Sequence, residues 1–493
     1  MSIYVDVHLL SGKSASLEVE ADASVESLKN RAQSALGTGR GRLLKSSGEV
    51  LDGAKTITEA KLMSGDVLTL SENQVQLNAT WIGSPFCAVA AILGDGSVVT
   101  WGQAGYGGDS CAVREQLKNV QQIQASGGAF AAILGNGSVV TWGDSGYGGD
   151  SSAVQDQLRD VQQIQASYGA FAAIRGDGSV VTWGSAADGG DSSAVQDQLR
   201  DVRQIQASVH AFAAILDDGS VVTWGNVDHG GDSRVVKDQL RDVQQIQASG
   251  CAFAAILGDR SVVTWGSADW GGDSSTVQDQ LRDVQQIQAS HGAFAAILGD
   301  GSVVTWGNVD TGGDSCMVQD QLRDVRQIQA SGRAFAAILV DGSVVTWGGA
   351  KHGGDSSAVK DQLRHVNQIQ SSRAAFAAIL GDGSVVTWGK AGHGGDSSAV
   401  QHQLRDVQQI QASFAIFAAI LGDGSVVTWG DAGTGGDSSK VQDQLRDVQQ
   451  IRASPAAFAA ILGDGSVVTW GSAADGGDSS AVQDQLRGSY LVG

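Results

Sequence analysis

The sequence predicts a mainly β protein, with a small α+β domain over residues 1–74 followed by an array of ten repeated four-stranded sheets over residues 75–493. Three observations lead to this prediction. A hairpin pattern and then a helical pattern fill the first 70 residues, and the triplet Thr-Trp-Gly afterwards recurs ten times at a spacing of 41 residues. The chain also has 68 glycines and only 2 prolines, which indicates many tight turns.

Composition excludes several classes of function. With 42% hydrophobic residues the chain can bury a large core, so it is not a disordered protein. Because 53 acidic residues outweigh 32 basic ones, a nucleic-acid partner is disfavoured. The apolar run at the N-terminus is interrupted by Asp6 and His8, which excludes a signal peptide, and no later stretch is long and apolar enough for a membrane span. We therefore expect a cytoplasmic or nuclear protein with no membrane partner.

The N-terminal residues have the order of a β hairpin, a helix and short strands. Apolar and polar positions alternate over residues 3–7 and 17–19, on either side of the turn-like residues 11–13. A helix is predicted to begin after Asp22 or Ser24, with apolar residues at helical spacing, and to end at the glycines of residues 37–41. Short strands follow near residues 43–44 and 67–70.

The segments SGKSASLEVE, VESLKNRAQ, GRLLKSSGEVLDGAKTI and SGDVLTL resemble segments of the ubiquitin family in the same order. The resemblance implies a ubiquitin-like β-grasp domain. It also implies a receptor-binding patch that contains Leu10 and Leu44, with Ser71 at the third position of that patch. Ubiquitin ends in a flexible Gly-Gly tail, whereas here Leu70 continues into SENQVQLNAT, so we expect a built-in domain.

Each 41-residue copy, such as 119–159, is predicted to contain four strands: VQQIQA, AFAAIL, SVVTW and a weaker AVQDQL. The second strand is apolar on both sides of its pleat, so the sheet must be covered on both faces. An isolated copy has too small a core to fold, and neighbouring copies must supply the rest. The repeats run from about residue 78 to residue 487.

The phrase AAILGDGSVVTWG followed by a glycine-rich loop resembles the repeat of the regulator of chromosome condensation family. That resemblance implies a β-propeller-like array of blades. The pattern itself leaves open whether ten copies close into one ring, form two rings or make an open arc.

The copies differ from one another mainly in two loops, which a meander places at the same end of the sheet. One loop follows Trp-Gly and the other follows the first strand. Aromatic, histidine and arginine side chains are frequent there, as they are at protein-binding hot spots. The candidate protein-binding residues are Tyr106, Tyr147, Tyr168, His210, His229, Trp270, His291, Arg333, His352, Arg373, His393 and Phe414. Unselected drift in tolerant loops would also explain the variation.

Other motifs favour structure over chemistry. The Gly-Asp-Gly turn is explained by its need for positive φ, so calcium is not required, and Arg260, which replaces the second Gly in one copy, is expected to strain its turn. Gly-Gly-Asp-Ser lacks the lysine and helix of a phosphate-binding loop. The cysteines lack the spacing of a zinc site or a disulfide framework, so we interpret them as free thiols. His352 and His393 lack the further ligands of a metal site, and no copy contains a unique nucleophile with its base.

These observations lead us to expect a non-catalytic scaffold or adaptor without a cofactor, which binds proteins through the variable loops. The two resemblances imply a link to the ubiquitin pathway, with ubiquitin receptors, the proteasome or ligase components as partners. They also imply two alternatives. One is a substrate-recognition component of a ubiquitin ligase, by analogy with ligases that join such repeats to a HECT domain, which this sequence lacks. The other is a guanine nucleotide exchange factor for a Ran-like GTPase.

Overall fold

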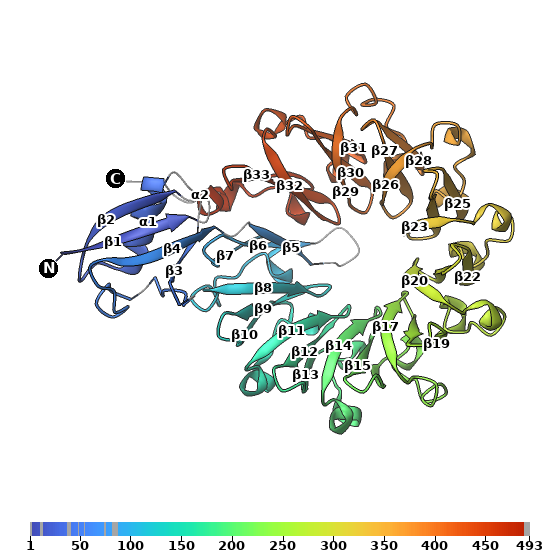
Figure 1. Cartoon of the computed structure of the whole chain (residues 1–493), viewed down its shortest axis with the longest axis horizontal. Helices are drawn as coiled ribbons and strands as arrows, with labels where there is room; N and C mark the ends of the chain where they lie inside the picture. Colours follow the sequence, from blue (N-terminus) through green and yellow to red (C-terminus); the bar gives the residue numbers. More distant parts are fainter. Residues whose placement is uncertain are drawn as a thin grey trace.

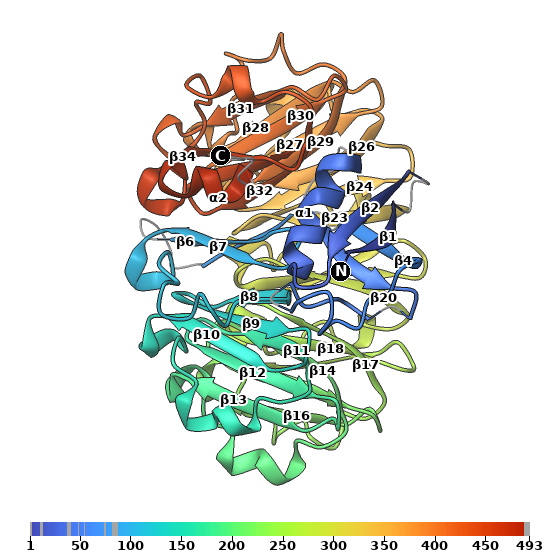
Figure 2. The same ribbon diagram turned by 90° about the vertical axis from the view of Figure 1, so that its left-hand side faces the viewer.

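A computed structural model describes residues 2–9, 13–36, 41–47, 49–53, 55–72, 75–80 and 87–487 of the chain. Within these residues, one four-stranded sheet with a helix precedes ten three-stranded sheets that are arranged in a ring (Figure 1). We call the three-stranded sheets blades 1 to 10 in chain order. The N-terminal domain lies outside the ring, beside blade 1 (Figures 1 and 2).

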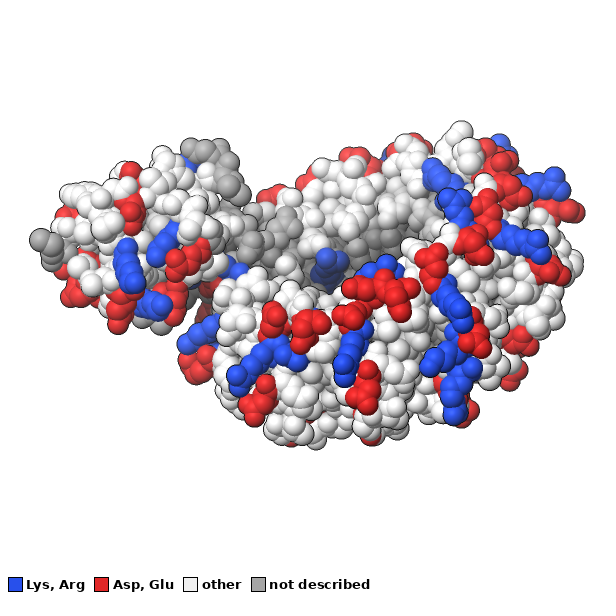
Figure 3. Space-filling model, turned by 60° about the horizontal axis from the view of Figure 1, so that its bottom comes forward, with Lys and Arg blue, Asp and Glu red and all other residues white. Residues whose placement is uncertain are grey.

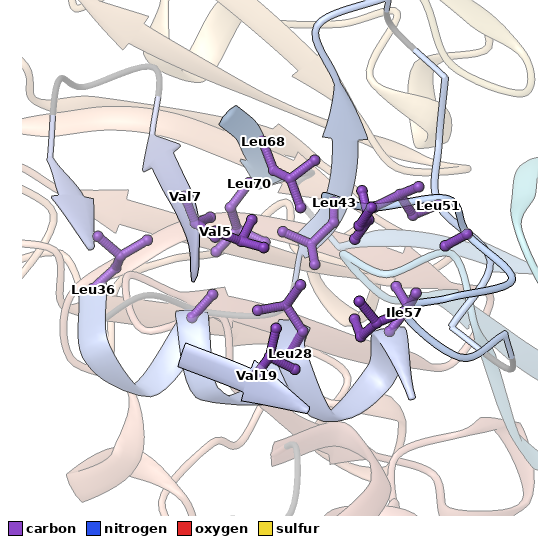
Figure 4. Packing of buried hydrophobic residues seen from close by; sticks show 14 of the residues in the cluster. Val5, Val7, Val19, Leu28, Leu36, Leu43, Leu51, Ile57, Leu68 and Leu70 are labelled. Carbon is purple, nitrogen blue, oxygen red and sulfur yellow. The ribbon is translucent and has the colours of Figure 1, made fainter. Parts of the chain in front are cut away.

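The N-terminal domain contains a mixed sheet with one helix. The hairpin of β1 (Ser2–Leu9) and β2 (Ser14–Glu20) is followed by α1 (Val25–Leu36), β3 (Gly41–Lys45) and β4 (Asp66–Glu72). The sheet order is β2-β1-β4-β3, and β1 and β4 are parallel. Val5, Leu28, Leu43, Ile57 and Leu70 are fully or almost fully buried between helix and sheet (Figure 4). The predicted order of hairpin, helix and short strands is confirmed, while the ubiquitin-like identity of this domain stays a prediction.

Each blade is an antiparallel meander whose first strand lies nearest the centre of the ring (Figure 1). The first strands are β5 (Gln76–Ala79), β8 (Val120–Ala125), β11 (Val161–Ala166), β14 (Val202–Ala207), β17 (Val243–Ala248), β20 (Val284–Ala289), β23 (Val325–Ala330), β26 (Val366–Ser371), β29 (Val407–Ala412) and β32 (Val448–Ser454). The second strands are β6 (Ala88–Ile92), β9 (Ala129–Leu134), β12 (Ala170–Arg175), β15 (Ala211–Leu216), β18 (Ala252–Leu257), β21 (Ala293–Leu298), β24 (Ala334–Leu339), β27 (Ala375–Leu380), β30 (Ile416–Leu421) and β33 (Ala457–Leu462). The third strands are β7 (Val98–Gly102), β10 (Val139–Gly143), β13 (Val180–Gly184), β16 (Val221–Gly225), β19 (Val262–Gly266), β22 (Val303–Gly307), β25 (Val344–Gly348), β28 (Val385–Gly389), β31 (Val426–Gly430) and β34 (Val467–Gly471).

The prediction of a fourth strand in each blade is wrong. In the copy of residues 119–159, which contains blade 2, the segment AVQDQL begins in a 3₁₀ helix, η3 (Ser152–Gln157), and ends one residue after it. Val154 and Leu158 both pack into the core between blades 2 and 3, whereas the side chain of Asp156 between them is fully exposed. In a strand all three side chains would lie on the same face, so this pattern fits a helical turn. The Gln155 side chain donates to the Val139 carbonyl at 3.0 Å. A side chain therefore satisfies part of the outer edge that a fourth strand would have paired.

The same segment is helical in other copies. The corresponding elements are η5 (Ser193–Gln198), η8 (Gln278–Gln280), η10 (Gln319–Gln321), η12 (Ser357–Val359), η15 (Gln442–Gln444), η17 (Ser480–Val482) and the short helix α2 (Gln483–Arg487).

The first copy begins earlier than the sequence comparison predicts. Aligning Asn78 with Asn119 would place the first strand of blade 1 over residues 79–84. In the structure that strand is Gln76–Ala79, and Asn78 pairs with Ala90 as Gln124 pairs with Ala131 in blade 2. Asn78 is therefore the counterpart of Gln124, so the chain between the first two strands of blade 1 is longer than in the other copies.

The core consists of layers between blades, as the two-sided apolar strand predicts. In β9, Phe130 and Ala132 pack toward blade 1, whereas Ala129, Ala131 and Ile133 pack toward blade 3. Blades 2 to 10 therefore present aliphatic residues on one face and a Phe–Trp pair on the other, whereas in blade 1 Val89 takes the place of the phenylalanine beside Trp101. The rings of Phe130 and Trp142 are stacked with their centroids 5.1 Å apart.

Hydrogen bonds join neighbouring blades and close the ring. The indole Nε1 of each repeated tryptophan donates to a glycine carbonyl of the preceding copy, as Trp142 does to Gly107 at 3.0 Å. In blade 1 the same bond runs from Trp101 to Gly476 at 2.8 Å. Residues of blades 1 and 10, including Val89 and Ile461, share one buried cluster. Of the arrangements that the sequence left open, the structure has a single closed ring.

The Gly-Asp-Gly turn joins the second and third strands at the end of the ring that we call the constant face. Only its second glycine has positive φ, 74° at Gly178, and the Asp177 carboxylate accepts from the backbone N–H and hydroxyl of Ser179. Arg260 occupies the glycine position in blade 5 with φ 64°. The turn thus keeps its conformation, and the strain predicted for Arg260 applies.

The N-terminal domain contacts the constant face near blades 1 and 2. Arg42, at the edge strand β3, is buried and donates from Nη2 to the Val120 carbonyl at 2.8 Å. The Nζ atom of Lys29 in α1 lies 3.6 Å from Oδ2 of Asp95, which belongs to the first Gly-Asp-Gly turn. The Arg42 bond has the same acceptor position as that from Arg203 of blade 4 to Val243 of blade 5. Arg42 of the N-terminal domain therefore makes the contact with blade 2 that Arg203 of blade 4 makes with blade 5.

Two further features bear on the class of protein. Cys111, Cys251 and Cys316 are free thiols. Among the described residues, no helix is both long and apolar enough to cross a membrane.

Candidate interaction surface

The two loops that vary between copies lie together at the end of the ring opposite the constant face, and we call this end the variable face. One is the turn between the first and second strands, and the other is a short 3₁₀ helix after the third strand. These helices are η1 (Ala104–Tyr106), η2 (Ser145–Tyr147), η4 (Ala186–Asp188), η6 (Val227–His229), η7 (Ala268–Trp270), η9 (Val309–Thr311), η11 (Ala350–His352), η13 (Ala391–His393), η14 (Ala432–Thr434) and η16 (Ala473–Asp475). The most variable loop residue is the last residue of each.

Backbone hydrogen bonds link the variable turns of successive blades. The N–H of Tyr168 donates to the carbonyl of Val209 at 2.8 Å, and the N–H of His291 donates to the carbonyl of Gly332 at 3.1 Å. Seven such bonds connect the turns from Gly127 to Phe414. We call this chain of bonds the backbone belt. Since it uses only main-chain atoms, it holds each turn in place whatever side chain the turn carries.

A constant serine fixes the second variable loop in the same way. Ser167 donates from its hydroxyl to the carbonyl of Asp188 at 2.7 Å, and Ser331 donates to the carbonyl of His352 at 3.0 Å. The glycine after each variable residue is also constrained. Gly148 has φ 89°, and a Cβ there would lie 2.7 Å from the Phe171 ring. The serine therefore holds the loop in the same way in blades 2 to 8 and in blade 10, while the last side chain of the 3₁₀ helix differs between copies. In blade 9, Ser413 donates to the Ser454 carbonyl instead.

Five of the predicted residues form a continuous track over blades 1 to 4. The ring centroids are 6.2 Å apart for Tyr106 and Tyr147, 5.4 Å for Tyr147 and Tyr168, 5.6 Å for Tyr168 and His210, and 4.5 Å for His210 and His229. Each contact crosses between loops that lie far apart in the sequence, and each ring is partly exposed. The structure therefore joins separate variable loops into one amphipathic surface.

The local environment changes the acidity of groups in this track. A hydrogen bond with Tyr168 and then burial raise the pKa of Tyr147 to about 12, so its phenol is neutral at physiological pH. Burial and then the neighbouring His210 lower the pKa of His229. The His210 Nδ1 also pairs with the Asp188 carboxylate. Apart from the Asp188 carboxylate and its His210 partner, these groups present neutral polar and aromatic atoms.

The remaining predicted residues gather in two further groups. Trp270 and His291 contact each other with centroids 4.6 Å apart. On blades 8 and 9, the Arg373 guanidinium lies 4.6 Å from the centroid of the Phe414 ring, which His393 also contacts at 5.9 Å. Arg333 is exposed and His352 is half-buried in the loops between these groups. All twelve predicted residues are thus on the variable face, and their role in binding stays a prediction.

The patch implied by the ubiquitin resemblance is only partly visible. Leu10 lies outside the described residues. Leu44 is half-buried on β3, two residues from Arg42 and therefore on the same side of the sheet, and Ser71 pairs with Arg42 across the strands. Because Arg42 is engaged with blade 2, the ring borders this side of the domain.

Sequence reasoning missed two basic residues of the variable face, Lys351 and Lys390. They lie in the η11 loop and immediately before η13, close to His352 and His393, and both are exposed. A comparison of net charge between corresponding loops would have found them, because they change the sign of the charge there. The surface in Figure 3, by contrast, mostly shows basic and acidic side chains side by side.

No protein-family model matches the chain, and no curated protein matches it. Among solved structures it is similar to Prp20p from Saccharomyces cerevisiae, with 15% identity, coverage of 57% of this chain and 82% of that one, and a TM-score of 0.34. It is similar to the computationally designed Ika8 protein with 15% identity, 63% and 96% coverage and a TM-score of 0.30. It is also similar to Caldiarchaeum subterraneum ubiquitin with 18% identity, 15% and 96% coverage and a TM-score of 0.14. At these scores the similarities carry no functional argument.

Proposed function

We propose that the chain is a non-catalytic protein-interaction scaffold that binds partner proteins through the variable face. One observation carries the proposal: side chains that differ between copies contact each other across blades, while the backbone belt and the constant serines hold their loops in nearly one conformation. A rigid frame with varied aromatic and basic side chains suits protein recognition, because little conformational entropy is lost on binding.

The chemistry of the face favours binding over catalysis. The His210–Asp188 pair has the form of a base and its orienting carboxylate, but a nucleophile must also be activated. Cys251 occupies the place of His210 in the next copy, and burial raises the pKa of its thiol to about 11. A thiol with a raised pKa is protonated at neutral pH and is a poor nucleophile.

A site-specific photo-cross-linking experiment tests this proposal. We would place a photoreactive phenylalanine analogue at Tyr168 on the variable face or, as the matched control, at Arg159 on the constant face, and identify cross-linked proteins from native cells. Partner proteins should be captured from position 168, and capture should be lost when Tyr147 is also changed to alanine. Equal capture from both positions would contradict the proposal.

We also propose, as a finer assignment, that the N-terminal domain links this scaffold to the ubiquitin pathway. The support is the sheet order, the buried core and the partly exposed Leu44 on the side of the domain away from its helix. The full chain should bind ubiquitin receptors more strongly than a Leu44→Ala variant does. Equal binding by the two proteins, or no binding by the full chain, would contradict the assignment. No contact among the described residues favours a ligase component or a nucleotide exchange factor over a scaffold.

A further inference from the structure

The charged side chains of the variable face are divided sharply around the ring. In the turns after the first strands and in the 3₁₀ helices with the residue before each, blades 7 and 8 carry four basic residues and no acidic residue. Asp355 and Asp396 follow later in the same loops, in the Gly-Gly-Asp-Ser segments. We call the four basic residues the basic segment: Arg333, Lys351, Arg373 and Lys390. At the same positions the other blades contain no Lys or Arg but carry these acidic residues: Asp144, Asp188, Asp228, Asp269, Asp310, Asp431 and the buried Asp475. In a chain of net charge −21, this concentration of positive charge is the exception.

The structure brings the basic segment together in space. His352 is close enough to three of its members for their charges to lower its pKa further, after the larger effect of burial. The pKa values of His291 and His393 are lowered as well, mainly by burial and then by neighbouring cations. The Arg373 side chain extends over the neighbouring turn, since a Cβ at Gly332 would lie 3.3 Å from its Cγ. Arg333, Arg373 and Lys390 therefore act on the same histidine, and Lys351 adjoins that histidine in the sequence.

These cations are also presented for contact with a ligand. All four are exposed, and none forms an ion pair with another described residue, whereas Arg159, Arg241 and Arg282 of the constant face pair with nearby aspartates. Phe414 supports the guanidinium of Arg373 from one side. The belt bonds from Gly332 and from Arg373 fix the two turns at 3.0 and 3.1 Å. Positive charge is thus held in place without a partner to neutralise it.

We propose that the basic segment binds a short acidic peptide segment of a partner protein, with its carboxylates against Arg333 and Arg373. This inference rests on the proposed scaffold function and names the chemistry of its partner. A short ligand is favoured over a long polyanion because Asp310 and Asp431 lie in the loops on either side, where a continuing chain of phosphates would be repelled. Guanidinium groups bind carboxylates with two hydrogen bonds, which suits an acidic peptide.

Fluorescence anisotropy with the full chain tests the inference. The probe is a short fluorescein-labelled peptide of alternating Glu, Asp and Gly, and the control peptide carries Gln and Asn in place of the acids. We expect saturable binding of the acidic probe at low salt, which weakens steadily as salt is added, and no binding of the control peptide.

Matched variants locate the site. The variant R333Q/K351Q/R373Q/K390Q removes four positive charges from the variable face, and R159Q/R241Q/R282Q/R323Q removes four from the constant face. The first should weaken binding by at least about a hundredfold, since one charge-assisted contact contributes about tenfold, whereas the second should change it less than about threefold. Replacing Arg333 and Arg373 by lysine should retain part of the affinity. Unchanged thermal unfolding shows that the variants are folded.

Several outcomes would overturn the inference. Absence of acidic-probe binding to the wild-type chain would do so, as would equal losses in the two quadruple variants. Tighter binding of a single-stranded oligonucleotide of equal charge would assign the segment to nucleic acid. A dimer in sedimentation that only the first variant dissociates would assign it to a second copy of the chain. If photo-cross-linking from Tyr168 still captures a partner while the peptide fails, the scaffold function survives and only this inference is wrong.

Discussion

The layers between blades and the variable face use the repeated sequence in opposite ways. Between blades, Phe294 and Trp306 recur in almost every copy and are nearly inaccessible to solvent, so the structure depends on these side chains. On the variable face, the residue corresponding to Tyr168 is glycine, valine, histidine, arginine, phenylalanine or proline elsewhere, and main-chain atoms hold its turn. The residue type is nearly constant at positions whose side chains stabilise the ring, and it differs between copies at positions where main-chain hydrogen bonds hold the turn.

The largest expected effect comes from a side chain between blades. Phe294→Ala removes a fully buried ring that stacks on Trp306, and we expect it to lower the free energy of unfolding by about 3–5 kcal/mol. The matched control is Phe414→Ala on the variable face, where the ring is half-buried and should contribute less than about 1.5 kcal/mol. Urea denaturation followed by tryptophan fluorescence measures both. Similar losses in the two variants would break the comparison.

Much of the layered core could be predicted from the sequence. The alternation of Phe130 and Ala131 on a strand without polar positions requires two covered faces, and the structure has them. The fourth strand could have been rejected because strand alternation would place the charged Asp156 on the same buried face as Val154 and Leu158. The bulge between Val161 and Gln163 could not be predicted, because strand alternation alone would separate Val161 from Ile164, whereas both are buried.

The candidate surface was predictable in position but not in its construction. Variation among copies identified Tyr168 and Arg373, and meander geometry placed both loops at one end of the sheet. The backbone belt has no signature in the sequence, because any residue except proline can donate its N–H. The basic segment depends on which loops become neighbours, and Lys390 and Arg333 lie in loops of different blades.

A second comparison concerns the constant face, where one copy departs from the rule. Arg260→Gly restores the residue that the left-handed turn favours, and we expect it to raise the free energy of unfolding by about 1 kcal/mol. The Arg260–Asp283 ion pair, at 2.7 Å between exposed groups, offsets only part of this gain. The control Gly301→Arg introduces the same residue in the next blade and should destabilise by a similar amount. Denaturant midpoints that move in the wrong direction in either variant would contradict the account of strain.

A smaller effect is expected from the histidines of the variable face. Burial and neighbouring cations lower the pKa of His291, His352 and His393, so the unfolded chain binds protons more readily than the folded chain. Stability from these groups is therefore present above the unfolded pKa of about 6.5 and falls as pH drops through the lower folded values.

Replacing all three by glutamine should reduce the loss of stability between about pH 7 and pH 5. Each histidine contributes at most about 1.4 kcal/mol per pH unit, and solvent screening lowers that limit because the rings are partly exposed. Denaturation at a series of pH values measures the difference. A variant that loses as much stability as the wild-type chain over this range would show that carboxylates alone govern it.

A small effect on the free energy of unfolding is also expected in the turns that the backbone belt stabilises. Tyr168→Ser should lower the free energy of unfolding by about 1 kcal/mol, because it removes the ring contacts with Tyr147 and His210 but keeps the belt bond to Val209, which uses the N–H. Tyr168→Pro removes that N–H and should cost about 1 kcal/mol more than serine does. Pro455 occupies the same sequence position in blade 10, where β32 continues to Ser454 and no belt bond leaves the turn among the described residues. If serine and proline were equivalent in urea denaturation, the belt would not stabilise the face, and the freedom of its side chains to vary would need another cause.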